Sequence, residues 1–260
     1  MIRFVGFPRG HNARRFVSAV KDAYARLRIR GRVVIVSERE YLPLYGLYPG
    51  SEGEWRVLAD EGALGEAIRT GWVRPLLHEL CHVKVYERLG CAPSALLGEP
   101  PCDALFEVFL DRQAPEGFLE FITDCVYMEV FPEYRHFFKP FGEYITTSLV
   151  RSFRRLTSGR VPTPVQFSNL FYCWWCHLLS SAYGEARPYG RMVARLRTVP
   201  RYSAVLSSFD ACLSRFRWPF TKWQVREKVR RLHRVYLAYT RGERFIYGQN
   251  ELDSDEDSRI

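Results

Sequence analysis

The sequence predicts an α+β fold, with a short sheet near the N-terminus and a mostly helical C-terminal part. Residues 32–38, RVVIVSE, are rich in β-branched side chains, and residues 54–60, EWRVLAD, have the length of a second strand. From about residue 136 onward, in contrast, apolar side chains recur at helical spacing almost without interruption. The 260-residue chain is 47% hydrophobic, which is enough to build a substantial core.

The first elements alternate between helix and strand. Apolar residues recur at helical spacing over residues 13–29, and Gly31 ends this helix. The strand at 32–38 follows, and a connection rich in turn residues, 41–53, leads to the strand at 54–60. We expect this second strand to pair in antiparallel fashion with a neighbouring one.

A long helix is expected next, over about residues 64–89. Pro75 is expected to break it, and Gly90 suits the left-handed residue that ends many helices. Residues 91–103 contain three prolines and are expected to form a loop. Residues 104–113 fit either a helix or a strand.

The remaining chain is predicted to be helical, apart from its last residues. Pro115 starts a strong helix, with proline and Glu116 in the first turn, where both are favoured. Later helices are expected to be separated by breaks at 158–164, 184–190 and 217–220. Residues 246–260 are acidic and polar and are expected to form a disordered tail.

Composition limits the classes of function only weakly. The formal net charge is +9 and comes mostly from arginine, a bias that fits ion-pair networks as well as a nucleic-acid partner. The N-terminus lacks a signal-peptide pattern, and the most apolar window, residues 167–184, is too short and too polar at its ends to cross a bilayer. We therefore expect a cytoplasmic protein with no membrane span, whose seven cysteines are mostly buried as small hydrophobic residues.

The most informative stretch is HELCH, residues 78–82. Helix positions four apart differ by about 40° in direction and about 6 Å in height, so His78 and His82 project from one face. Two imidazoles placed in this way can bind one zinc ion, while Glu79 can reach a zinc-bound water without binding the metal. The motif therefore predicts a zinc site in which Glu79 is catalytic. The competing interpretation is an ordinary helix that carries two histidines by coincidence.

A second polar pair lies on the helix that Pro115 starts. Glu120 and Asp124 are four residues apart on an otherwise apolar helix, where a carboxylate costs free energy unless it is paired or binds a cation. We predict that Glu120 is the third zinc ligand and that Asp124 orients a ligand histidine. Glu116 and Asp124 stay open as alternatives for the third ligand, and an exposed acidic stripe is the alternative without a metal.

This combination of residues resembles the gluzincin group of zinc metallopeptidases, which are thermolysin-like, and also the small minimal zincins. In that group, His-Glu-x-x-His lies on one helix and Glu-x-x-x-Asp on a second helix downstream. The matching residues in this chain are His78, Glu79, His82, Glu120 and Asp124.

The resemblance implies a fold and an activity. It implies a zincin-like catalytic core over residues 1–150, followed by a helical lobe over 151–245. It also implies that an edge strand of the sheet, which we assign to residues 54–60, binds a peptide or protein substrate in extended form. Peptide bonds would be hydrolysed by a zinc-bound water that Glu79 activates.

The donor that stabilises the transition state is less well defined. Tyr127, Tyr134 and His136 are candidates because they follow the Glu120–Asp124 pair closely.

Two other stretches carry weaker signals. YCWWCH, residues 172–177, has Cys-x-x-Cys spacing but no second pair, so core packing is favoured over a metal or redox site. Residues 215–244 are basic and interleaved with aromatic residues, which is typical of a nucleic-acid-binding helix. An amphipathic helix with arginines around an apolar face explains the same pattern and is favoured. The alternative function is thus a non-catalytic zinc-containing or nucleic-acid-binding protein that acts through this basic helix.

Overall fold

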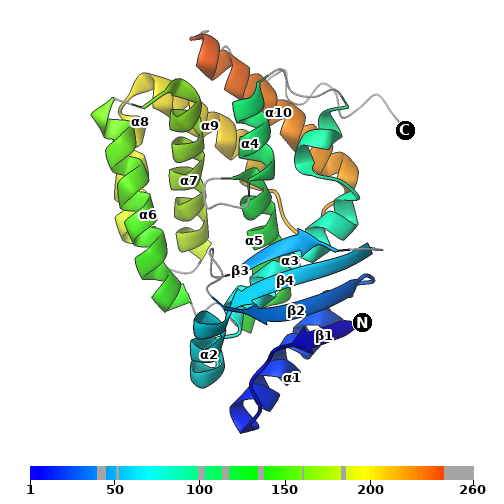
Figure 1. The fold of residues 1–260 in the computed structure, drawn as a ribbon. Helices are drawn as coiled ribbons and strands as arrows, with labels where there is room; N and C mark the ends of the chain where they lie inside the picture. Colours follow the sequence, from blue (N-terminus) through cyan, green and yellow to red (C-terminus); the bar gives the residue numbers. More distant parts are fainter. Residues whose placement is uncertain are drawn as a thin grey trace.

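A four-stranded sheet forms the N-terminal part of the computed structural model, and helices make up the rest (Figure 1). The α+β class predicted from the sequence is therefore confirmed. The structure describes residues 1–39, 45–50, 53–98, 103–112, 117–133, 138–159, 161–182 and 186–242.

The sheet is mixed and contains one antiparallel edge strand. Its strands are β1 (Ile2–Val5), β2 (Arg32–Glu38), β3 (Tyr45–Pro49) and β4 (Glu54–Asp60). They lie in the order β1-β2-β4-β3, with β1, β2 and β4 mutually parallel and β3 antiparallel to β4. The strands β1 and β3 thus form the two edges.

The prediction that residues 54–60 form the edge strand was wrong. This segment, β4, is hydrogen-bonded to β2 on one side and to β3 on the other, and its Val57 and Ala59 are fully buried. The edge position belongs to β3, within the stretch predicted to be a turn-rich connection. Gly46 and Pro49 favoured that prediction, but a proline is tolerated in a strand at a sheet edge, where it need not donate a ladder hydrogen bond.

Strand β1 was not predicted because its four residues are too few to show a pattern. Its residues alternate between half-buried and exposed, and they pair in register with β2, as Ile2 does with Val33. The helix α1 (His11–Arg26) then connects the two parallel strands, as parallel pairing requires. It begins and ends within three residues of the predicted helix.

The helix predicted over residues 64–89 is two helices, α2 (Glu61–Thr70) and α3 (Arg74–Leu89). Gly71 ends α2 with a left-handed φ of 74°, a conformation that glycine adopts without steric cost. Pro75 stands in the first turn of α3, where its missing N–H group is no loss. The break near Pro75 is therefore confirmed, three residues earlier than the proline itself.

Beyond α3 the described chain is helical apart from short connections. The elements are η2 (Pro93–Leu97), α4 (Ala104–Asp111), α5 (Phe118–Val130), α6 (Phe138–Ser158), α7 (Thr163–Ala182), α8 (Ala186–Arg197), α9 (Pro200–Leu213) and α10 (Lys222–Arg241). Residues 104–111 are thus helical, and the break between α8 and α9 was not predicted. The predicted boundary at residue 150 falls inside α6, the division into two domains stays a prediction, and residues 246–260 lie outside the described residues.

Aromatic side chains fill the core between the C-terminal helices. The ring of Phe171 on α7 lies 5.6 Å from that of Phe121 on α5 and 5.3 Å from that of Phe209 on α9. Cys173 and Cys176 are also buried, so the YCWWCH stretch packs in the core as favoured. Among the described residues, no helix combines the length and apolar character needed to cross a membrane.

Helix α3 occupies the centre of the molecule. It packs against β3 and β4 and also against α1 and α5 (Figure 1). Its buried residues consequently point in almost every direction and include Arg74, Glu79 and His82. Polar side chains in such surroundings cost free energy unless they are paired or bind a ligand.

Candidate metal centre

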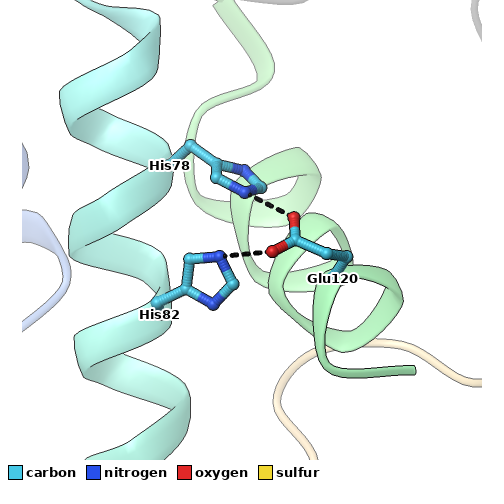
Figure 2. Close-up of side chains that lie close together, drawn as sticks. All are labelled: His78, His82 and Glu120. Carbon is cyan, nitrogen blue, oxygen red and sulfur yellow. Dashed lines mark hydrogen bonds and ion pairs between the residues drawn. The ribbon is translucent and has the colours of Figure 1, made fainter. Parts of the chain in front are cut away.

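The two polar motifs meet where α3 and α5 pack side by side in antiparallel orientation. The Arg74 guanidinium, near the start of α3, lies 5.4 Å from the ring centre of Tyr127, near the end of α5. His82, two turns further along α3, instead contacts Glu120 near the start of α5. Figure 2 shows both imidazoles of α3 turned towards the Glu120 carboxylate.

One carboxylate joins the two histidines. His78 Nε2 lies 2.8 Å from Glu120 Oε2, and His82 Nε2 lies 2.9 Å from Oε1 (Figure 2). The Glu120 side chain is only 12% exposed to solvent and that of His82 only 2%, whereas the His78 side chain is 18% exposed. Solvent therefore reaches this group from the His78 side.

The other ring nitrogen of each histidine also faces a polar residue of α5. His78 Nδ1 lies 3.3 Å from Asp124 Oδ1, and His82 Nδ1 lies 2.9 Å from the Thr123 hydroxyl. Asp124 and Thr123 are both buried. The Thr123 hydroxyl is thus hydrogen-bonded to His82 Nδ1, whereas the Asp124 carboxylate lies next to His78 Nδ1 without a hydrogen bond. In both rings Nε2 is directed at Glu120 and is the atom available as a metal ligand.

Burial and charge shift the pKa values of this group in the metal-free protein. Burial alone would lower the pKa of His78, but Glu120 and Asp124 raise it to about 10. For Glu120, burial acts to raise the pKa, yet the neighbouring His82 and His78 hold it well below the ordinary value. Without a metal, His78 and Glu120 therefore form a charged pair.

The Glu79 carboxylate lies beside this group without joining its hydrogen bonds. Burial raises its pKa, His82 and His78 partly oppose that change, and Glu120 reinforces it. Its Oε2 is buried and has no hydrogen-bond partner among the described residues. A buried carboxylate oxygen without a partner is costly, and water or a substrate group would satisfy it.

The donors fit a divalent metal ion. One ligand atom each from His78, His82 and Glu120 lies within 4.8 Å of the other two. A tetrahedral zinc ion with bonds of about 2.1 Å needs donor atoms about 3.4 Å apart, a spacing that small side-chain rotations can supply. Two imidazoles and one carboxylate are also a known ligand set for zinc with an open fourth position.

The structure does not bring every predicted residue to the site. Tyr127 is fully buried and lies about 10 Å along α5 from Glu120, with its ring beside the Arg74 guanidinium. Its role as a transition-state donor stays a prediction. Tyr134, His136 and the alternative ligand Glu116 lie outside the described residues. Asp124 lies next to Nδ1 of His78, whereas Glu120 contacts Nε2 of both histidines. This difference favours Glu120 as the third ligand.

Sequence analysis missed Thr123 and Arg74. Thr123 follows Glu120 by three residues, so helical spacing alone could have placed its hydroxyl near the carboxylate pair. Arg74 precedes His78 by four residues and continues the row of polar side chains on α3. Neither residue type is diagnostic of a metal site in a sequence, because threonine and arginine are common at other positions of helices.

Comparison of the chain with protein-family models, with curated proteins and with solved structures found no match. The resemblance to gluzincins therefore rests on the two short motifs and their geometry. What the site itself establishes is a group of two histidines and one glutamate that could hold a metal ion.

Proposed function

We propose that this chain is a zinc-dependent peptidase in which His78, His82 and Glu120 hold the metal and Glu79 is the general base. The observation that carries the proposal is the convergence of these three donors, 2.8 and 2.9 Å apart at their contacts, beside a buried carboxylate that has an unpartnered oxygen. A metal site with three protein ligands and partial access to solvent has the composition of a catalytic site rather than a closed structural one.

The position of β3 supports a peptide substrate. This edge strand packs against α3, the helix that carries both histidines. The side of β3 away from β4 is paired with no strand of the described sheet. A substrate in extended conformation can add to such an edge through backbone hydrogen bonds, which would bring it alongside the metal ligands.

Each residue then has a defined task. Bound zinc would polarise the scissile carbonyl and lower the pKa of a water molecule at the site. Glu79 would take the proton of the attacking water and deliver it to the leaving amine. Asp124 and Thr123 would keep the histidine Nδ1 atoms engaged, so that each Nε2 stays directed at the metal.

The test combines metal analysis with peptide cleavage. We expect the purified chain to contain one zinc per molecule, to lose it on His78→Ala, and to cleave an unfolded protein substrate. Glu79→Gln should retain the zinc but lower the cleavage rate about 10²- to 10⁴-fold, because it removes only the base. The matched control is Glu129→Gln, an exposed glutamate on α5 about 180° around the helix from Glu120.

The rival function is a zinc-containing protein without catalysis. It predicts bound zinc in the wild type, lost on His78→Ala, but no cleavage by any variant. Absence of zinc from the wild type even after metal is supplied would contradict both functions. Unchanged cleavage by Glu79→Gln would contradict the assignment of the base.

A further inference from the structure

The outward side of α10 is a second candidate surface, remote from the candidate metal centre in sequence and independent of the peptidase proposal. We define the arginine face as the outward side of α10, formed by Trp223, Arg226, Arg230, Arg234 and Arg241. Positions in this set lie within about 80° of one another around the helix axis. All five residues are exposed.

The orientation of α10 is fixed by its apolar side. That side is buried among η2, α7 and α9 through Val225, Val229, Leu232, Val235, Tyr236 and Tyr239. A capping box formed by Thr221 and Gln224 sets the first turn. The amphipathic-helix interpretation is thus correct for the inner side. It leaves the residues of the arginine face exposed on the side of α10 opposite the buried one.

Positive charge on α10 is concentrated and only partly neutralised. The helix carries seven lysines and arginines and a single acidic residue, Glu227. Glu227 lies 2.9 Å from Arg231 and 4.0 Å from Arg234. Arg226 and Arg230 have no carboxylate within 4.0 Å among the described residues. Within the described part of the chain, Arg226 and Arg230 are therefore available for an anionic partner.

The spacing of the arginines suits a polymer with repeated negative charges. From Arg226 to Arg241 the helix axis extends about 22 Å, which is long enough to pass several successive phosphates of one strand. Arginine binds phosphate with two parallel hydrogen bonds, so it suits such a partner better than lysine does.

Trp223 adds a second, independent observation. Its side chain is 67% exposed, the most exposed tryptophan among the described residues. It precedes Arg226 by one turn on the same side of α10. An exposed aromatic ring next to cations offers a surface on which an unpaired base can stack.

We propose that the arginine face binds single-stranded nucleic acid, with Arg226 and Arg230 on phosphates and Trp223 stacked on a base. A membrane surface fits less well. Helices that lie on membranes insert their apolar side into the lipid, and on α10 that side is inside the core.

The test measures binding of a fluorescently labelled 20-nucleotide oligo(dT) to the full chain by anisotropy. We expect saturable binding that weakens with salt, and quenching of tryptophan fluorescence that Trp223→Phe reduces. The double variant Arg226→Gln, Arg230→Gln should bind about ten-fold more weakly, and its salt slope should fall by about 1.4, since each contact contributes about 0.7.

A matched control removes the same charge elsewhere. Arg14 and Arg15 are exposed on α1, which lies at the opposite end of the view from the C-terminal end of α10 (Figure 1). Arg14→Gln with Arg15→Gln should leave affinity within about two-fold of the wild type, because only the general field changes.

Three results would overturn the proposal. One is the absence of binding by the wild type at 50 mM salt. Another is an equal loss of affinity in the α1 control, which would assign the binding to net charge. The third is binding to phosphatidylserine vesicles without binding to oligo(dT), which would assign the arginine face to lipid. Zinc content and cleavage are not used in this test, so its outcome is separate from that of the peptidase proposal.

Discussion

The α3–α5 pair and α10 both carry many polar residues, but under opposite physical conditions. The polar side chains with which α3 and α5 face each other are buried, as the side-chain exposures of 6% for Asp124 and 2% for His82 show. On α10 the arginines of the outward side stand in solvent, and the apolar side chains of the inner side are buried. Burial makes each polar residue of the first pair costly unless it is paired, whereas the arginines of α10 cost almost nothing where they are.

This difference changes what each pattern can teach. A buried cluster of polar side chains that face one another points to a specific site, because burying such groups costs free energy unless they are paired or bind a ligand. A charged face in solvent becomes informative only through a further feature, which on α10 is the exposed ring of Trp223. Substitution of one residue in each setting therefore tests this contrast.

The largest expected effect comes from removing the shared carboxylate. In chelator-treated protein at pH 6, Glu120→Ala should lower the free energy of unfolding by about 3 kcal/mol, because it leaves buried charge without its partner. Arg226→Gln on α10 should change it by less than about 0.5 kcal/mol. Urea unfolding monitored by circular dichroism measures both. Similar losses in the two variants would break the contrast between the regions.

The pH dependence of stability sharpens the same point. The pKa of His78 is raised from 6.5 to about 10, so its stabilising contribution is complete below pH 6.5 and is lost as the pH rises towards 10. The pKa of Glu120 is lowered from 4.5, so its contribution is present above pH 4.5 and is lost as the pH falls further. Metal-free wild type should therefore lose stability between pH 6.5 and 10.

The variant that isolates this effect is Glu120→Gln. Its free energy of unfolding should fall less steeply over the same alkaline range, because the group that raises the pKa of His78 has lost its charge. Urea titrations of both proteins at pH 6.5, 8 and 9.5 make the comparison. Parallel curves would mean that the pair does not govern the pH response.

A smaller effect is expected at Thr123. Thr123→Val keeps the side-chain shape but removes the hydroxyl that lies 2.9 Å from His82 Nδ1. Loss of such a partner typically weakens metal binding 10- to 100-fold, and we expect about ten-fold because the ligands themselves remain. Competition with a chromophoric chelator gives the zinc affinity. Thr157→Val, at an exposed position on α6, is the control and should bind zinc like the wild type.

How far the sequence predicts the site depends on spacing within single helices. His78 and His82 are four residues apart, as are Glu120 and Asp124. Helix geometry then places each pair on one face without any tertiary information. That the two pairs meet was a hypothesis, and the distances to Glu120 agree with it. The partner of His82 was missed because a threonine hydroxyl serves equally well in a cap, a turn or a core.

The sheet was less predictable for a different reason. β4 was placed correctly along the chain, but its neighbours were not, because strand order depends on contacts that sequence patterns do not encode. The edge strand β3 contains Gly46 and Pro49, residues typical of turns, and only its pairing with β4 makes it a strand. The edge strand was therefore assigned to β4, whereas it is the preceding strand, β3.

The smallest expected effect is on Trp223, and it tests whether the arginine face contributes to the stability of the fold. Trp223→Ala should change the free energy of unfolding by less than about 0.5 kcal/mol, because the ring is 67% exposed. Tyr236→Ala on the inner side of the same helix should cost about 3 kcal/mol, since that ring is 1% exposed and its hydroxyl donates to Asp103 at 2.7 Å.

Thermal unfolding of the two variants and the wild type gives the comparison within one helix. If Trp223→Ala costs as much as Tyr236→Ala, the tryptophan packs against another part of the chain and its exposure is no sign of a binding surface. If the stability is unchanged while binding of oligo(dT) weakens, an exposed aromatic residue has identified a function that charge alone did not. A solvated helix face would then carry as much functional information as the buried histidines, because the exposed ring would be retained for binding rather than for folding.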